Sequence, residues 1–171
     1  DNYCMVANHA VSIVAEAVCK DFGGFDRERA WAAVERTLRV SHPAKTDWET
    51  YLKYGYYPAD LKPTESVSLS LEQAYDDYAA MCMARHLGKE AETREFGRRA
   101  ELWRNLFCPV THFMRPRLVD GSWLSPFNPS TLAHAESSGG HYTEGNAWQY
   151  TWHVQHDVPS LIKLMGGSRA F

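Results

Sequence analysis

Apolar residues recur at helical spacing through most of the first 107 positions of this 171-residue chain, and this pattern restricts the possible folds more than any other feature. Over residues 5–20 the apolar positions lie three or four apart, as they do on one face of an amphipathic helix. A Gly-Gly pair at 23–24 ends the pattern, and Asp26 is a suitable N-cap for a second helix that stops before Pro43. The two segments predict a helical hairpin.

Two further helices are predicted beyond a connecting segment. Residues 43–66 mix aromatic residues with Gly and Pro, which indicates a connection with at most a short helical turn. Ser70 followed by Gln73 matches the capping-box pattern of a helix start, and Gly88 is suited to end that helix. A fourth helix is expected over residues 90–107. Because no strand-forming run competes, the predicted fold class is all-α, built from helical hairpins.

The segment 108–141 interrupts this pattern with repeated Pro and Gly residues, which forbid a long helix or strand. Loops of this length are uncommon in compact domains unless they are functional. Five large side chains on this segment make it a candidate wall of a site: Phe113, Arg115, Arg117, Trp123 and Phe127. Helical signal returns at about 146–154, and Asp157 is expected to cap a last helix that ends at the Gly pair 166–167.

Composition excludes several classes of partner. The 18 Lys and Arg against 21 Asp and Glu give a net charge of −3, without the basic stripe that nucleic-acid binding needs. No run of about 18 apolar residues is present, so no membrane-spanning helix is expected. The four Cys show no close paired spacing typical of zinc or redox sites, and we expect them to be buried free thiols.

The most polar and aromatic stretch, residues 141–157, contains Glu144 just before a predicted helix. Burial beside aromatic rings would raise the pKa of this carboxyl and a helix N-terminus would lower it, and the sequence leaves both outcomes open. If burial prevails, Glu144 is suited to act as a general acid. Hydrolysis of a sugar linkage needs such an acid, a second carboxylate and aromatic faces that hold the ring. The alternative is a capping or salt-bridged Glu144 among core aromatic residues.

Other polar residues favour structural roles. His153 and His156 lie three apart and could bind one metal ion, but no third ligand stands at an expected spacing, so a hydrogen-bonded pair is favoured and no metal site is predicted. Asp76 and Asp77 are adjacent on a helix and point apart, so we expect one to pair or cap and the other to meet solvent. His9, among apolar neighbours, is expected to be a hydrogen-bonded core residue.

The segment YTEGNAWQYTW at 142–152, followed by HDV at 156–158 and LMGG at 164–167, closely resembles glycoside hydrolase family 92, the bacterial exo-acting α-mannosidases. Other segments along nearly the whole chain are also similar to the family. They are HA at 9–10, GFD at 24–26, YGYYPAD at 54–60, LEQAYDD at 71–77, WRNLF at 103–107, FMRP at 113–116 and DGSW at 120–123.

The resemblance implies a fold and an activity. The fold is an all-α (α/α)6 barrel packed on a β-sandwich domain, and the activity is calcium-dependent, α-1,2-mannosidase-like hydrolysis of terminal α-mannosides with inversion. Glu144 matches the family's general acid, Asn146 matches a position expected to contact mannose in the −1 subsite, and Trp148 and Gln149 are further expected substrate-binding residues. Linkage specificity stays open. The resemblance also implies a location outside the cytoplasm.

The chain also departs from the family. Members are several hundred residues long, so residues 1–171 are expected to be one all-α segment of the barrel, without the β-sandwich and the later barrel helices. The downstream motifs that supply the calcium ligands and the water-activating carboxylate are not matched, so calcium is expected to bind outside this chain, which alone should be inactive. Asp76 and Asp157 do not correspond to the family's base.

One physical expectation and two competing hypotheses accompany this prediction. The apolar faces of an incomplete barrel would favour self-association or modest stability. One competing hypothesis is a non-catalytic helical module that binds glycans through Trp123, Trp148 and Trp152. Another is a purely structural helical fragment without sugar binding.

Overall fold

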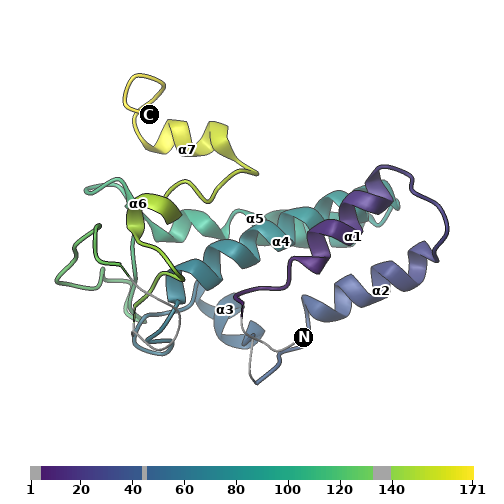
Figure 1. Ribbon diagram of the computed structural model, residues 1–171, viewed down its shortest axis with the longest axis horizontal. Helices are drawn as coiled ribbons and strands as arrows, with labels where there is room; N and C mark the ends of the chain where they lie inside the picture. Colours follow the sequence, from purple (N-terminus) through teal and green to yellow (C-terminus); the bar gives the residue numbers. More distant parts are fainter. Residues whose placement is uncertain (1–4, 44–45, 133–139) are drawn as a thin grey trace.

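The computed structural model describes residues 5–43, 46–132 and 140–171, and its long central helix is α4, Ser66–His86. Helices α1 (Ala10–Cys19) and α5 (Glu90–Ala100) pack against α4, and α2 (Arg27–Thr37) runs back beside α1 (Figure 1). The predicted N-terminal hairpin and the all-α class are confirmed. The remaining elements are α3 (Trp48–Tyr54), the 3₁₀ helix η1 (Leu102–Leu106), β1 (Phe107–Cys108), β2 (Phe113–Met114), α6 (Ala147–Tyr150) and α7 (Val158–Leu164).

Local capping signals fix several helix ends as predicted. The Asp26 carboxylate accepts a hydrogen bond from the Arg29 amide at 3.0 Å, which satisfies one of the free amides at the start of α2. Gly88 follows the last residues of α4 in the left-handed region, with φ 73°, and so ends that helix. Helix α1, by contrast, begins at Ala10 rather than Met5. The backbone turns at Ala7, with φ 56°, and the Asn8 amide donates to Asp76, so a tertiary contact replaces the expected first turn.

The connection before α4 contains more helix than predicted. Helix α3 has seven residues, because the Asp47 side chain caps it by accepting from the Thr50 amide at 3.0 Å. Gly55 ends it in the left-handed region with φ 75°. The expectation of at most a short turn underestimated this local cap.

The prediction that Ser70 opens the third helix was wrong. Helix α4 begins four residues earlier, and the Ser70 hydroxyl donates to the Ser66 carbonyl inside it at 2.6 Å. The backbone carbonyls of Gly140 and His141 accept hydrogen bonds from the amides of Glu65 and Val67 at 2.7 and 3.1 Å. A distant segment therefore caps α4, which no local pattern could indicate.

The later elements are shorter than predicted. The expected helix at 90–107 ends at Ala100 and continues as η1, and β1 pairs antiparallel with β2 in two-residue strands. Helix α6 has four residues instead of the nine expected. Asp157 occupies the N-cap position of α7 as predicted, but its carboxylate binds Arg104 at 2.7 Å rather than a backbone amide.

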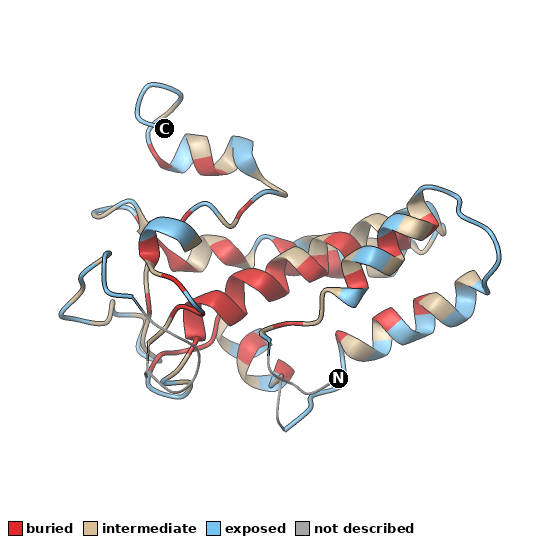
Figure 2. Ribbon diagram, viewed as in Figure 1, coloured by how far each residue is buried: buried red, intermediate tan, exposed pale blue. Residues whose placement is uncertain are grey.

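Buried residues follow α4 along most of its length (Figure 2). The first core lies between α1, α2, α3, α4 and α5 and contains Trp31, Trp48 and Phe96. The second core joins the other end of α4 to the C-terminal half and contains Trp103, Leu106 and Leu161. Within the described residues, every helix is too short or too polar to traverse a membrane, and Cys19, Cys82 and Cys108 are free thiols, of which only Cys108 is fully buried. Cys4 lies outside the described residues.

Candidate active site

A polar stripe on α4 positions the candidate site. Glu65, just before the helix, and Ser68, Glu72 and Asp76 within it lie three or four positions apart, so their side chains share one face. All four residues are buried, and this face meets His9 and the segment 141–153. Buried polar groups need partners, and each of the four has at least one.

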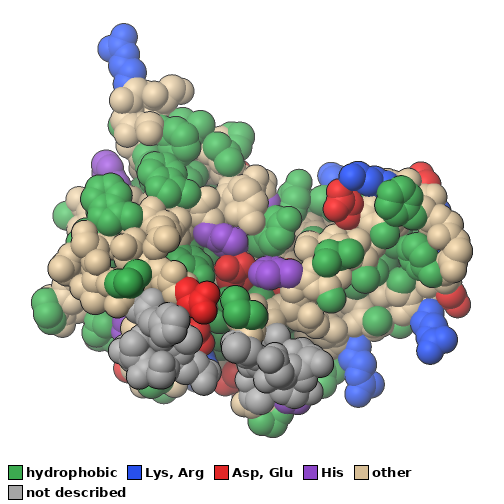
Figure 3. Space-filling model, viewed as in Figure 1, with side chains coloured by type: hydrophobic (Ala, Val, Ile, Leu, Met, Phe, Trp, Pro, Cys, Tyr) green, Lys and Arg blue, Asp and Glu red, His purple; other side chains and the backbone are tan. Residues whose placement is uncertain are grey.

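Glu72 lies at the centre of a cluster of charged and polar side chains. Its Oε2 atom is 2.8 Å from His9 Nε2 and 2.9 Å from His153 Nε2. The other ring nitrogen of His9, Nδ1, is 2.9 Å from Asp76 Oδ1. Two His side chains with acidic atoms between them are visible near the middle of one molecular face (Figure 3). We call His9, Glu72, Asp76 and His153 the His–Glu cluster.

Hydrogen bonding sets the charges of this cluster. Hydrogen bonds to Asp76 and Glu72 raise the pKa of His9 to about 10, although partial burial opposes this shift. Burial alone would raise the pKa of Glu72, but hydrogen bonds from His153 and His9 outweigh it and lower this pKa to about 2. At neutral pH, His9 is therefore a cation and Glu72 a carboxylate, and the two form an ion pair at 2.8 Å.

Aromatic rings surround the His–Glu cluster. The Tyr75 ring lies 6.0 Å from that of His9 and 6.3 Å from that of His153, both edge-on. Tyr150 lies 5.9 Å from His153 and 6.0 Å from Tyr142. The Glu72 and His153 side chains are mostly shielded from solvent, at 11% and 24% exposure, whereas the His9 side chain is 41% exposed.

Glu144 lies in the loop before α6, as the sequence predicts, and its side chain is exposed. The burial considered for it from the sequence is absent from the described structure. Its backbone has φ 48°, in the left-handed region. The preceding Thr143 anchors the loop through two hydrogen bonds. Its hydroxyl donates to the Glu65 carboxylate at 2.8 Å, and its amide donates to the Ser68 hydroxyl oxygen at 2.7 Å. Buried bonds thus hold the backbone while the carboxyl meets solvent.

The three expected substrate-binding residues lie beside Glu144 on α6. Asn146 and Gln149 form a reciprocal capping box, in which Oδ1 of Asn146 accepts from the Gln149 amide and Oε1 of Gln149 accepts from the Asn146 amide. Their side-chain nitrogens take no part in these two bonds. The Trp148 ring is 54% exposed and rests edge-on against Phe113 at 4.7 Å.

Residues 116–131 line part of a cavity, and two arginines of the same loop contact its aromatic rings and backbone. Of the five large side chains expected to form a site wall, Phe127 is the one that lines this cavity. Arg115 lies over Phe127 at 4.4 Å and donates to the Leu124 carbonyl. Arg117 lies over Trp123 at 5.1 Å and donates to the carbonyls of Gly121 and Asn105. The cavity has a volume of 180 Å³ and is lined in part by Pro116, Phe127 and Tyr142.

The remaining candidates divide between structural contacts and exposed surface. Asp76 belongs to the His–Glu cluster and Asp77 pairs with Arg99, so the prediction that one of the two meets solvent was wrong. His156 Nε2 is 3.1 Å from the Ala100 carbonyl, and burial lowers its pKa, which supports a structural role. Trp152 is exposed and contacts Phe171 edge-on at 5.3 Å. Among the described residues, no three His, Cys, Asp or Glu side chains could together hold a metal ion.

Sequence reasoning missed the role of Glu72 and only partly described His9. His9 is hydrogen-bonded as expected, but its side chain is 41% exposed rather than part of the core. The spacing of Glu65, Glu72 and Asp76 along one helix was the available signal, because acidic residues repeated on one face of a buried helix require partners.

The whole chain, residues 1–171, matches the glycosyl hydrolase family 92 catalytic domain. A solved family GH92 α-mannosidase of Bacteroides thetaiotaomicron, in complex with mannoimidazole, is similar with 40% identity and a TM-score of 0.89, over 95% of this chain and 21% of that one. A family GH92 inverting mannosidase of the same bacterium gives 32% identity and a TM-score of 0.89, over 99% and 23%.

A curated relative extends these similarities. An uncharacterized secreted glycosidase of Arthroderma benhamiae is 26% identical over 197 residues, which cover 96% of this chain and 25% of that protein. The chain therefore spans a quarter or less of the length of these relatives.

Proposed function

Because the chain belongs to glycosyl hydrolase family 92, whose catalytic domain it matches over residues 1–171, we propose that it carries part of the active site of an α-mannosidase. Its helices form part of the (α/α)6 barrel found in the family. In this proposal the β-sandwich and the other barrel helices belong to further parts of a longer polypeptide. The substrate is a terminal α-mannoside, and the reaction is hydrolysis with inversion.

One observation carries the assignment of Glu144 as general acid. Its carboxyl is exposed while buried hydrogen bonds of Thr143 hold the loop against α4. A general acid must present its proton at a fixed place beside the leaving-group oxygen, and this arrangement provides such a place. Glu144 would protonate the glycosidic oxygen as the bond to the sugar breaks, and its own carboxyl group would become a carboxylate.

The general base would come from outside the described residues. An inverting enzyme needs a second carboxylate about 6.5–9.5 Å from the acid, with room for water. Asp76 is bound to His9 and to the Asn8 amide, and Asp157 is paired with Arg104. Both carboxylates are therefore engaged, and we assign neither to the activation of water.

Asn146, Trp148 and Gln149 are proposed to bind the mannose. The side-chain nitrogens of Asn146 and Gln149 provide donors for sugar hydroxyls, because the capping box uses only their oxygens. The exposed Trp148 ring provides an apolar face for a sugar ring.

Calcium belongs to the proposal only as a component of the longer enzyme. Calcium takes six to eight oxygen ligands, and several carboxylates commonly supply them. The described residues contain no group of acidic or histidine side chains that fits a metal ion. They therefore do not fit the ion, and we assign no step of the reaction to calcium in this chain.

Hydrolysis of two α-mannosides tests the role of Glu144 in the longer polypeptide that contains this chain. One substrate has a poor leaving group, as in a mannobiose, and the other an activated aryl leaving group. We expect Glu144→Gln to lower kcat on the mannobiose by about 10²–10⁴-fold, the range for general acid catalysis. The loss on the activated substrate should be much smaller, because a good leaving group needs little protonation.

Glu90→Gln serves as the matched control, since Glu90 is exposed on α5. NMR of the first-formed sugar anomer tests inversion. Equal losses on both substrates would contradict the acid role. Mannoside binding without hydrolysis, unaffected by Glu144→Gln, would instead support the glycan-binding module.

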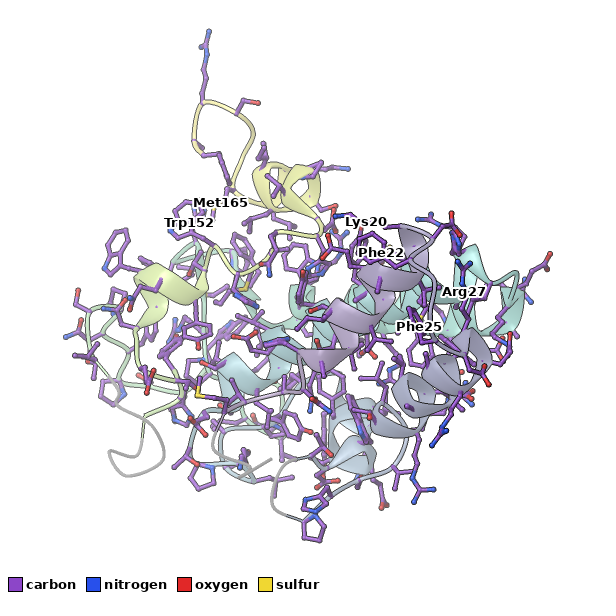
Figure 4. The ribbon with its side chains drawn as sticks, turned by 45° about the vertical axis from the view of Figure 1, so that its right-hand side comes forward. Lys20, Phe22, Phe25, Arg27, Trp152 and Met165 are labelled. Atoms are coloured by element: carbon purple, nitrogen blue, oxygen red, sulfur yellow. The ribbon has the colours of Figure 1, made fainter. Side chains whose placement is uncertain are left out.

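Location and self-association complete the proposal. We propose action outside the cytoplasm, in agreement with the secreted glycosidase among the relatives. Exposed apolar side chains support self-association of the chain alone: Phe22 and Phe25 lie at the connection between α1 and α2, and Trp152 lies before α7 (Figure 4). Light scattering that shows a monomer at all concentrations would contradict this part.

A further inference from the structure

We propose that Glu72 is a positioning residue that, through its contacts with His9 and His153, fixes the segment carrying Glu144. This inference rests on the proposed function, because the positioned group is the proposed general acid. It assigns to Glu72 no contact with the substrate.

Glu72 joins three parts of the chain that are distant in sequence. It lies on α4, His9 lies directly before α1, and His153 follows α6. One oxygen atom of Glu72, Oε2, lies within 2.9 Å of Nε2 of His9 and of Nε2 of His153. Asp76 contacts the other ring nitrogen of His9, Nδ1, so this imidazole has a carboxylate at each nitrogen and a fixed orientation.

The path from His153 to Glu144 is short and consists of ordered contacts. The His153 amide donates to the Tyr150 carbonyl at 3.1 Å, and the Tyr150 ring lies 6.0 Å from that of Tyr142, the residue before Thr143. Thr143 is the residue before Glu144. The segment 143–153 is therefore attached to α4 at two places, at Ser68 and Glu65 near Glu144 and at Glu72 near His153.

The charges of the cluster make the second attachment strong. The groups that face Glu72 and His9 are Asp76 and Tyr75 from α4 and His153 from the C-terminal segment. Glu72 remains a carboxylate because its pKa is lowered to about 2, and it is 8% exposed. A buried carboxylate within 2.9 Å of two imidazole nitrogens resists displacement, since moving the rings away leaves its charge without a partner.

Loss of this attachment should change catalysis more than folding. Gln has nearly the shape of Glu, so Glu72→Gln removes no side chain from either hydrophobic core. A displacement of about 1 Å in a catalytic group can lower the rate by about 10²-fold. The same segment carries Asn146, Trp148 and Gln149, so KM should rise together with the loss of kcat.

Four variants of the longer polypeptide test the proposal with a mannobiose substrate. Glu72→Gln keeps the shape but removes the charge, and His153→Ala removes one hydrogen-bond donor. We expect both to lower kcat by about 10–100-fold, with a rise in KM because the proposed mannose-binding residues lie on the same segment. In His153→Gln the amide can donate from the position of Nε2, so most of the kcat lost in His153→Ala should return. Glu90→Gln is the control for loss of an exposed charge.

A second measurement does not depend on activity. In this chain, NMR amide shifts of Glu144 and Gly145 should change in Glu72→Gln and His153→Ala, and should return toward the parent values in His153→Gln. If the parent enzyme hydrolyses no mannoside, the proposed function fails and these shifts alone decide the positioning. Unchanged shifts, or kcat values within twofold of the Glu90→Gln control, would overturn the inference.

Discussion

The buried pair of Arg99 and Asp77 offers the most quantitative test of the packing. Asp77 is fully buried on α4, and its two carboxylate oxygens lie 2.7 and 3.1 Å from Nη2 and Nε of Arg99. The guanidinium also donates to the Leu38 carbonyl at 2.9 Å and lies over the Trp48 ring at 4.6 Å. Replacement of Arg99 by Met keeps much of the side-chain volume but removes every one of these contacts of the guanidinium.

The expected loss follows from the burial of an unpaired carboxylate. Removing one partner of a buried ion pair costs about 3–5 kcal/mol of the free energy of unfolding. Burial raises the pKa of Asp77 and Arg99 opposes this rise, so Arg99→Met should raise the pKa further. In the parent this pKa is already raised to about 8, so folding is accompanied by proton uptake at pH 7, which from the ordinary pKa of 3.8 costs about 4 kcal/mol. The folded variant should bind this proton more tightly still.

The sign of the pH dependence is therefore fixed. The folded parent and the folded variant both bind a proton at Asp77 more tightly than the unfolded chain, so the stability of both should increase as the pH falls. The difference between them should widen as the pH rises through about 8, where the parent releases this proton and the variant keeps it. Between pH 8 and pH 9 we expect the cost of Arg99→Met to grow by about 1 kcal/mol, from about 1.36 kcal/mol for each pH unit.

Urea unfolding followed by tryptophan fluorescence at pH 7 and pH 9 measures this change. The double variant Asp77→Asn, Arg99→Met has no ionisable group at the site and should lose the pH dependence and recover part of the stability. A cost for Arg99→Met below about 1 kcal/mol, or one that does not vary with pH, would refute the reasoning.

Two further predictions concern the backbone and the His–Glu cluster. Gly55→Ala should lower the free energy of unfolding by more than about 1 kcal/mol, because φ is 75° and the new Cβ would lie 2.6 Å from Asn105 Nδ2. Gly88→Ala is the control for the backbone strain alone, since φ is 73° and the new Cβ would have no atom within 4 Å. Equal urea midpoints for the two variants would disprove the clash with Asn105. The stabilisation from His9 is complete below its ordinary pKa of 6.5 and is lost as the pH rises through about 10. Because His9 is partly exposed, we expect a loss on the order of 1 kcal/mol over that range, which His9→Gln should not show in urea unfolding; parallel curves for the two proteins would contradict the role of His9.

Predictions from sequence succeeded where the cause is local. Asp26 and Gly88 end or begin helices through contacts within a few residues, and both positions agree with the structure. The hairpin pattern of the apolar residues also gives the correct class, since burial of one helix face requires a neighbour. Glu144 is correctly placed in the loop before α6.

The failures share a different cause, which is contact between distant segments. Ser70 has the residues of a capping box, but carbonyls from Gly140 and His141 supply the cap and start α4 earlier. Asp77 meets Arg99 rather than solvent because α5 packs over it. The His–Glu cluster likewise joins residues from three elements, so no single window of sequence contains it.

The remote cap of α4 has a consequence for hydrogen exchange. The amides of Glu65 and Val67 are protected by carbonyls of residues 140 and 141, only a few positions before Glu144. Undocking of that segment would expose these amides to deuterium while the rest of α4 stays helical. The exchange rates of these two amides therefore measure how often the loop that carries the proposed acid undocks from α4, and this measurement requires no substrate.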